Sequence, residues 1–369
     1  MNIPLSSPDI QPQDIEAVVE VMKTTSLSLG PKLKEFERKT AEYTGVKHAV
    51  AVNSGTSALH LIVRAMGLQA GDEVITTPFS FVASANCMLF EGAAPVFVDI
   101  ESNTYNLNID LIKDAITPNT KAILAVDVFG QPPDWDRLRE IADKHHLFLI
   151  EDSAEAIGAT YKGRKAGSLG DVGLFAFYPN KQMTTGEGGI IVTDNDEIAN
   201  LCRSMRNQGR DEGAGWLQHA RLGYNYRLSD INCALGIAQL ERLDDMLAER
   251  AKVAGWYNER FNEVADIQTI CVSPDVSISW FVYVVRLADH YSRQDRDQIL
   301  DRLRNKGIQC SNYFTPIHLQ PFYKQFGYQD GNFPTTEHVS GRTIALPFFN
   351  KLRESQVETV VDTLKELLK

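Results

Sequence analysis

Cysteine is scarce in this sequence, and the few cysteines are scattered. The chain has five of them, at positions 87, 202, 233, 271 and 310. Their number is odd, and no two form a C-x-x-C pair. Neither a disulfide framework nor a zinc or other metal site is therefore expected.

Positive charge is also in deficit. The chain has 37 Lys and Arg against 48 Asp and Glu, which gives a formal net charge of −11. A general nucleic-acid-binding protein presents a basic face, so no nucleic-acid partner is expected. A small anionic ligand is not excluded, because the local field of a site can differ in sign from the net charge.

Long hydrophobic runs are missing as well. No stretch approaches 18 consecutive apolar residues, so neither a membrane span nor a membrane partner is expected. The first seven residues, MNIPLSS, contain no basic region that leads into an apolar run. No signal peptide is predicted from them, and the expected compartment is the cytoplasm.

The sequence does have the length and composition of a large soluble protein. Of its 369 residues, 43% are hydrophobic and 23% are charged. From residue 46, short apolar runs alternate with helical patterns. The runs predict strands over 49–52, 73–76, 95–98, 122–126, 147–150, 172–177 and 189–192, with helices over 58–66, 81–90, 135–145 and 196–207. This alternation predicts an α/β fold with a mostly parallel sheet and helices on both faces.

The ends of the chain show other patterns. An arm with a helix over 14–24 comes first, followed by a helix over 32–44. Later segments predict a long helix over 228–264, strands over 280–286 and 308–311, and helices over 293–306 and 354–368. We predict an N-terminal arm and large α/β domain in residues 1–245 and a smaller α+β domain in residues 246–369. Residues 208–220 have three glycines and no periodicity, which predicts a mobile loop near the site.

A single lysine lies between two of the predicted strands. The stretch from Phe175 to Gly189 reads FAFYPNKQMTTGEGG and places Lys181 at a glycine-rich turn. A lysine held by such a backbone can serve as an amine that attacks a carbonyl and forms a Schiff base. The alternative is a surface lysine at a hairpin turn, and this stretch alone does not decide between them.

Polar residues follow several other strands of the same predicted sheet. Asn53-Ser54-Gly55-Thr56-Ser57 stands at a helix start, where free N–H groups bind a phosphate, although it could be only an N-cap. Asp152 follows a strand, where a carboxylate can pair with a protonated ring nitrogen or merely cap the next turn. Phe81 could stack on a flat cofactor or belong to the core. Asn225 and Arg227 could bind an anion or form a surface turn.

Together these residues form a coherent set. A phosphate seat at 54–57, an aromatic side chain at 81, a carboxylate at 152 and a lysine at 181 are the parts that a pyridoxal 5'-phosphate (PLP) site requires.

The sequence resembles the DegT/StrS-type nucleotide-sugar aminotransferases, a branch of the fold-type I PLP enzymes. The resemblance covers nearly the whole length. It is strongest in NSGTSAL (53–59), ED (151–152), GRKAGSLGD (163–171), KQMTTGEGG (181–189), the segment 223–230 and YFTPIHLQPFY (313–323). It implies a large domain with a mostly parallel seven-stranded sheet and a smaller α+β C-terminal domain.

The resemblance also implies roles for individual residues. Lys181 would be the Schiff-base lysine and proton carrier, and Asp152 would pair with the pyridine nitrogen. Six further residues would contact the cofactor, and three would contact the substrate. One of the six, Asn225, would reach the cofactor from the neighbouring subunit of a homodimer. The cofactor contacts are Ser54, Gly55, Thr56, Phe81, Glu155 and Asn225, and the substrate contacts are Arg227, Tyr313 and His318.

Three positions bear on how far the resemblance extends. Many relatives have a phosphate-binding Ser where this chain has Ala176, so that contact is missing or is made by Ser57 or another group. Many have Gln or His at the position of Glu155, and a glutamate there is reminiscent of enzymes that aminate a 4-keto sugar. Some members replace the lysine by histidine and are dehydratases, and the presence of Lys181 disfavours that branch.

The expected activity follows from these features. A PLP-dependent transaminase would move the amino group of an amino acid, L-glutamate by expectation, to a keto group of a nucleotide-diphosphate-linked deoxysugar. C4 is favoured over C3. The alternatives are a PLP-dependent nucleotide-sugar dehydratase and a non-catalytic ligand-binding or regulatory member of the family.

Overall fold

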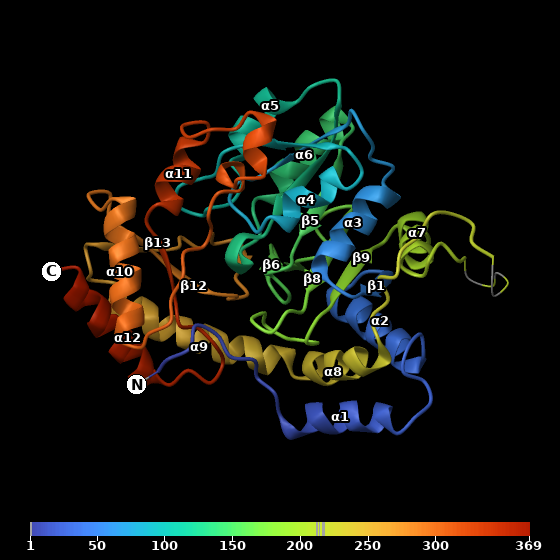
Figure 1. The fold of residues 1–369 in the computed structure, drawn as a ribbon, viewed down its shortest axis with the longest axis horizontal. Helices are drawn as coiled ribbons and strands as arrows, with labels where there is room; N and C mark the ends of the chain where they lie inside the picture. The colour runs from blue at the N-terminus through green and yellow to red at the C-terminus, as the bar shows by residue number, and fades with distance from the viewer. Residues whose placement is uncertain (1, 212, 214, 216–217) are drawn as a thin grey trace.

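The computed structural model describes residues 2–211, 213, 215 and 218–369. At its centre is a seven-stranded sheet (Figure 1). The strand order is β1 (His48–Val52), β9 (Gly189–Thr193), β8 (Val172–Ala176), β5 (Phe148–Asp152), β4 (Thr120–Val126), β2 (Glu73–Thr76) and β3 (Ala94–Phe97). β9 is antiparallel to both of its neighbours, and the remaining pairs are parallel. The mostly parallel seven-stranded sheet expected from the sequence is confirmed.

Helices cover both faces of this sheet because alternate side chains of its strands are buried on opposite sides. Ile150 and Leu174 face α3 (Gly55–Ala65), α4 (Ala83–Leu89) and α7 (Asp196–Arg206). Phe175 and Ile190 face α2 (Pro31–Thr44) and α8 (Asp230–Glu241). Further along the second face, Leu149 packs against α6 (Trp135–His145). The remaining short elements of residues 1–245 are α1 (Pro12–Met22), η1 (Ile109–Leu111), α5 (Ile112–Ala115), η2 (Val128–Gly130), β6 (Thr160–Tyr161) and β7 (Arg164–Lys165).

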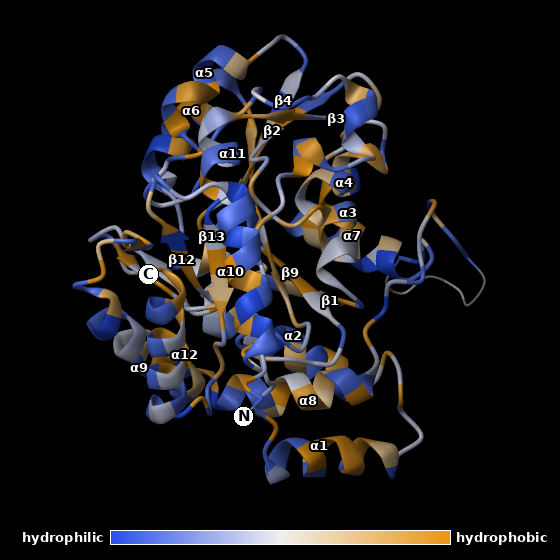
Figure 2. Ribbon diagram, turned by 60° about the vertical axis from the view of Figure 1, so that its left-hand side comes forward, coloured by the Kyte–Doolittle hydropathy of each residue, from blue (hydrophilic) through white to orange (hydrophobic). Residues whose placement is uncertain are grey.

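The C-terminal part forms its own antiparallel sheet. Its strand order is β10 (Ile267–Thr269), β12 (Tyr283–Leu287) and β13 (Thr343–Leu346). Figure 2 shows α10 (Arg293–Asn305) as a largely hydrophilic helix, in contrast with the hydrophobic β9 of the large sheet. The other elements are α9 (Leu243–Phe261), β11 (Val276–Ser277), η3 (Ile317–Leu319), η4 (Tyr323–Phe326), α11 (Pro334–Ser340) and α12 (Glu354–Leu367). The predicted domain boundary at residue 245 lies inside α9, which packs against α8 on one side and α12 and β10 on the other.

Two sequence predictions differ from the structure. The strand expected over 308–311 is wrong, because Ile308 bridges to Ile3 of the N-terminal arm and Ser311 bridges to Ala345 of β13, so the segment changes partner before a ladder can form. The long helix over 228–264 is two helices, since the backbone at Arg242 leaves the helical region. The strand over 73–76 and the helix over 135–145 are confirmed with the expected bounds.

The loop over 208–220 falls partly outside the described residues, and its mobility stays a prediction. Among the helices that the structure describes, none has the length and apolar character needed to cross a membrane.

Candidate active site

The predicted site residues converge on one cavity of about 940 Å³ at the carboxyl-terminal edge of the parallel strands. Open α/β sheets place their ligands at this edge, because the loops after the strands all meet there. Two segments of the C-terminal part close the other side: Phe281, just before β12, and residues between 312 and 323. Eight predicted residues line the cavity, namely Ser54, Gly55, Thr56, Phe81, Asp152, Glu155, Lys181 and Tyr313.

Lys181 lies in the turn between β8 and β9, and its side chain is only 13% exposed. Its Nζ is 3.5 Å from Oε1 of Glu155 and 3.9 Å from the ring centroid of Phe281. The surface-turn interpretation of this lysine does not fit such burial. The amine is instead confined between a carboxylate and an aromatic face, inside the cavity.

Asp152 ends β5 and is 3% exposed. Its Oδ2 accepts a hydrogen bond from Ser84 Oγ at 2.7 Å, and its Oδ1 accepts one from the backbone N–H of Ala154 at 3.2 Å. Burial raises the pKa of Asp152, while the two hydrogen bonds and the charge of Lys181 oppose that rise. A carboxylate in this setting gains most from a cationic partner that enters the cavity, because the interaction replaces water that burial has removed.

Glu155 is held from the side away from the lysine. Its Oε2 accepts a hydrogen bond from the backbone N–H of Phe129 at 3.1 Å, and Phe129 has the unusual φ of 58° for a non-glycine residue. Burial raises the pKa of Glu155, and Lys181 and the Phe129 N–H lower it. Because the backbone fixes one carboxyl oxygen, the other is directed at Lys181 Nζ.

The start of α3 forms one wall of the cavity. Ser54 is its N-cap, and its Oγ accepts the backbone N–H of Ser57 at 3.0 Å. The N-cap interpretation of this motif is therefore correct, and the N–H groups at Gly55 and Thr56 still face a cavity that an anion could enter. Ser57 does not line the cavity, and its Oγ donates to Asn53 Oδ1 at 2.7 Å.

Three predicted residues lie outside the cavity lining. Asn225 is exposed and pairs with Asn207, and Arg227 Nη1 donates to Asn207 Oδ1 at 3.1 Å. His318 is fully buried, and its Nε2 is 3.0 Å from Glu337 Oε1. Burial lowers the pKa of His318, and Glu337 opposes that shift. The structure therefore does not bring these three side chains to the cavity within one subunit.

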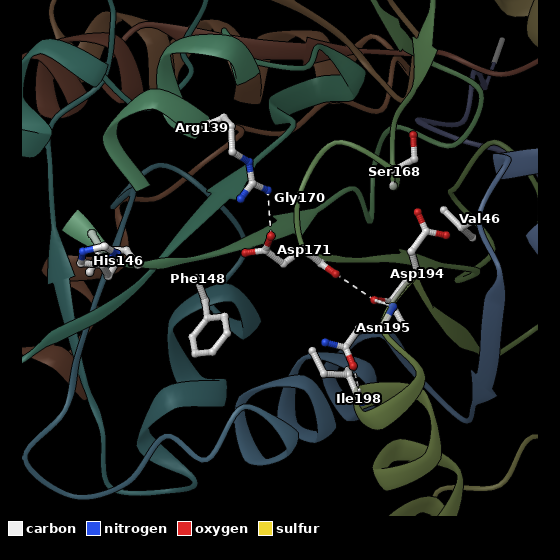
Figure 3. A pocket seen from close by; sticks show the side chains of 13 residues that line it. Val46, Arg139, His146, Phe148, Ser168, Gly170, Asp171, Asp194, Asn195 and Ile198 are labelled. Carbon is white, nitrogen blue, oxygen red and sulfur yellow. Dashed lines mark hydrogen bonds and ion pairs between the residues drawn. The ribbon is translucent and has the colours of Figure 1, made fainter. Parts of the chain in front are cut away.

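A second hollow, of about 660 Å³, lies at the opposite edge of the large sheet (Figure 3). Its charged residues are already paired, since Arg139 Nη2 is 2.9 Å from Asp171 Oδ1 and Asp171 Oδ2 accepts the N–H of Leu149 at 2.7 Å. Asn195 caps α7 with its side-chain oxygen. The hollow has no amine comparable with Lys181, so the chemistry points to the cavity at the carboxyl-terminal edge.

Comparisons with known proteins agree with this geometry. Residues 8–365 match the DegT/DnrJ/EryC1/StrS aminotransferase family. The chain belongs to this family. The GDP-perosamine synthase of Caulobacter vibrioides is 40% identical over 371 residues, 99% of this chain and 98% of that protein. The structure of the putative sugar aminotransferase Spr1654 from Streptococcus pneumoniae, in its PMP form, covers 99% of both chains with a TM-score of 0.95 and 30% identity. DesV of S. venezuelae covers 96% of this chain and 93% of its own, with a TM-score of 0.90 and 34% identity.

As a member of the DegT/DnrJ/EryC1/StrS aminotransferase family, the chain is a PLP-dependent aminotransferase. The cavity fits this cofactor. It combines the amine of Lys181, the buried carboxylate of Asp152 and the start of α3, which an anion can approach. A Cβ added at Gly189 would lie 2.6 Å from the carbonyl carbon of Ser54 and 2.7 Å from the backbone N of Gly55. Only a glycine lets β9 pass this close to the helix start.

This aminotransferase also has site residues that the sequence did not reveal. Ser84 bonds Asp152, and Phe281 faces Lys181 Nζ. Ser84 lies in a segment whose small and apolar residues predict a buried helix. Phe281 lies in a predicted strand, 100 residues from Lys181 in the sequence. No local pattern could have assigned either residue to the site. Ala176 lines the cavity too, and its Cβ lies 2.8 Å from the position of a Cβ added at Gly55.

A buried carboxyl pair supports β5 from behind the cavity. Ser153 Oγ is 2.6 Å from Asp127 Oδ2 and 2.9 Å from Glu151 Oε1. One hydroxyl proton cannot serve both oxygens, so one of the carboxyl groups is protonated. Glu151 accepts the backbone N–H groups of residues 167, 169 and 170, whereas Asp127, apart from its contact with Ser153, receives only the Trp135 N–H at 3.3 Å among the described residues. These contacts favour the proton on Asp127 over the proton on Glu151.

The pH dependence of stability tests this assignment. Burial, followed by the neighbouring Glu151, raises the pKa of Asp127 well above its usual range. The folded state then keeps a proton that the unfolded chain releases above pH ~3.9. Stability is lost as the pH rises from there through the folded pKa. We expect Asp127→Asn to avoid this loss, so its unfolding free energy relative to the parent should increase with pH in urea titrations.

Glu151→Gln is the matched comparison. It turns an amide NH₂ toward backbone N–H donors and should lower the unfolding free energy by roughly 2–4 kcal/mol. If Asp127→Asn were as destabilised as Glu151→Gln at pH 8, the proton would be on Glu151 instead.

Proposed function

We propose that this chain transfers an amino group from L-glutamate to a keto group of a nucleotide-diphosphate-linked deoxysugar in the cytoplasm, with a C4 ketone favoured over C3. The observation that carries the proposal is the meeting of Lys181, Asp152 and the start of α3 in one cavity. The kinship with GDP-perosamine synthase and with sugar aminotransferases supports a sugar substrate. The preference for C4 rests on Glu155.

The cofactor would be held by residues of four segments. We assign its carbonyl end to Lys181, its ring nitrogen to Asp152, its ring face to Phe81 and its ring oxygen to Glu155. Phe81 is an aromatic side chain, yet it is 62% exposed. Its ring is therefore free to stack on a flat cofactor. The phosphate is assigned to Ser54, Gly55 and Thr56 at the start of α3. Since Ala176 has no hydroxyl and Ser57 is turned away, the helix N–H groups provide most of that contact.

When bound, PLP supplies an electron sink that makes a proton on the adjacent carbon of an amino acid removable. Lys181 Nζ would take this proton from the amino-acid carbon and deliver it to the former carbonyl carbon of the cofactor, because it is the amine among the described residues that line the cavity. Asp152 Oδ1 and Oδ2, fixed by Ala154 and Ser84, hold a proton on the ring nitrogen. The aromatic wall, including Phe281 and Tyr313, excludes water around the amine.

Substrate contacts are assigned to Tyr313 in the cavity and to Arg227, which would reach the cavity of a neighbouring subunit. For His318, the buried position favours an indirect role. It bonds Glu337, whose carboxylate accepts the N–H groups of Gly331 and Phe333, and thereby shapes the segment that follows the cavity-lining residues. We further propose a homodimer in which Asn225, exposed on its own subunit, reaches the phosphate of the neighbouring one.

A panel of dTDP-, UDP- and GDP-linked 3-keto and 4-keto sugars, incubated with L-glutamate and read by mass, tests the proposal. The expected product is an amino sugar formed together with 2-oxoglutarate. Loss of water from the sugar without glutamate consumption would instead indicate the dehydratase. No reaction and no bound PLP would indicate a non-catalytic member of the family.

Gly189→Ala tests the phosphate seat. The added Cβ must push the start of α3 away, so we expect the dissociation constant of PLP to increase by roughly tenfold or more, as one lost charge-assisted contact would produce. Cofactor binding by fluorescence titration measures it. The matched control is Gly255→Ala in α9, where an added Cβ meets nothing within 4 Å. Equal affinities in the two variants would contradict this seat.

A further inference from the structure

One buried arginine joins the lysine turn to the C-terminal part of the chain. Arg250, on α9, is 2% exposed. Its Nη2 donates to the carbonyl oxygen of Lys181 at 3.1 Å, and its Nη1 donates to the carbonyl oxygens of Trp280 at 3.3 Å and Phe281 at 3.2 Å. One guanidinium group therefore bonds the main chain on both sides of the cavity.

This arginine lacks the usual compensation for a buried charge. Within the described part of the chain, no carboxylate forms an ion pair with Arg250, and its Nε has no hydrogen-bond partner. Burial lowers the pKa of Arg250 to about 10, so the group is still charged at neutral pH. The three carbonyl dipoles, the ring of Phe348 at 5.4 Å and the charge of Asp9, which forms no ion pair with it, stabilise the guanidinium group. A hydrophobic side chain would avoid the desolvation but could not reproduce the planar fork of donors.

The bonded segments are those that determine where the amine points. The ring of Phe281 lies 3.9 Å from Lys181 Nζ, so the carbonyl groups held by Arg250 belong to the lysine and to its aromatic neighbour. Gln182 fastens the same two segments again, since its Nε2 donates to the carbonyl oxygen and the Oγ of Ser279 at 3.0 and 2.9 Å. Two side chains, Arg250 and Gln182, thus connect the turn that follows β8 to the segment that precedes β12.

We propose that Arg250 is a positioning residue for Lys181. By bonding the Lys181 and Phe281 carbonyl groups at once, it fixes the Phe281 ring against Nζ and directs the amine into the cavity. Arg250 itself does not line the cavity, so it acts through these two residues. The inference rests on the role proposed above for Lys181 and extends it to the C-terminal part of the chain.

Arg250→Lys tests this role, because lysine keeps the charge but cannot span three carbonyl groups. The matched control is Arg296→Lys. Arg296 is also buried, at 3% exposed, and bonds the carbonyl oxygens of Ser340 and Thr343 at 2.8 and 2.9 Å, away from the cavity. The measurements are thermal unfolding, the rate at which borohydride traps PLP on Lys181 (read by mass), and kcat and KM for L-glutamate.

We expect both variants to unfold at lower temperature, and Arg250→Lys alone to slow trapping and lower kcat, by roughly tenfold or more, as misplacement of a reacting group does. KM should change far less. Phe281→Leu keeps the bonded carbonyl group but removes the ring, and it should also slow trapping. This variant tests the proposal if Arg250→Lys does not fold. The proposal would be overturned if trapping and kcat in Arg250→Lys stayed within about twofold of the parent. If only Phe281→Leu folds, the same result in that variant would overturn it. Normal trapping in the parent enzyme with no sugar product would instead count against the proposed substrate.

Discussion

Lys181→Ala is expected to abolish amino transfer, with a loss of roughly 10⁴-fold or more, while the protein stays folded. No other amine is available among the described residues that line the cavity. The fold should survive because, among the residues that the structure describes, Nζ contacts a single carboxylate, at 3.5 Å. Glu155 is left behind, but burial raises its pKa, so it can take up a proton instead of remaining as an uncompensated charge. Product formation by mass and unfolding by circular dichroism measure the two effects.

Lys165→Ala is the matched control for the loss of a lysine. Lys165 is also partly buried, but its Nζ lies 3.3 Å from the ring centroid of Tyr43, outside the cavity. Its removal should leave kcat within about twofold of the parent. A Lys181→Ala enzyme that kept comparable activity would refute the mechanism, since the proton would then be moved by another group.

Asp152→Asn is expected to lower kcat by roughly 10²- to 10³-fold, the scale of losing one preorganised electrostatic contact. The variant should fold, because the hydroxyl chain can reverse its direction. Ser84 Oγ lies 2.9 Å from Ser80 Oγ, so it can donate to Ser80 and accept from the new amide. What the amide cannot do is carry the negative charge that keeps a proton on the ring nitrogen. Steady-state kinetics with L-glutamate and the visible absorbance of bound PLP measure the result.

Asp127→Asn is the natural control, because it makes the same chemical change one strand away. Asp127 follows β4 as Asp152 ends β5, yet the contacts around Ser153 already favour the uncharged form of Asp127. An asparagine there should preserve activity. If the two variants lost activity equally, the effect at Asp152 would reflect damage to the sheet edge and not the loss of a charge next to the cofactor.

Local pattern and family resemblance predicted most of the large sheet and most of the cavity lining. Strands such as 73–76 are continuous apolar runs, which makes them easy to predict. Polar residues at their carboxyl ends can be assigned to one site because parallel strands end at the same edge of the sheet. Residues whose position depends on distant partners were missed or misplaced. His318 stands in a motif that suggests a substrate contact, but burial against Glu337 decides its position. The 308–311 segment has strand-like composition, but its two partners lie on different elements. Phe281 and Arg250 meet the lysine only through folding of the C-terminal part.

The antiparallel pairing of β9 limits where residues can be inserted into this enzyme during evolution. A crossover between parallel strands can absorb extra residues in its loops without moving the strand ends. The connection 177–188 is different, because Ala176 and Gly189 are direct partners in adjacent antiparallel strands and pin both of its ends. An insertion there would bulge outward and carry Lys181 with it. Insertions should therefore be tolerated in the crossover loops, such as residues 116–119. Between residues 177 and 188 they should abolish activity. A scan of single-residue insertions would measure both effects.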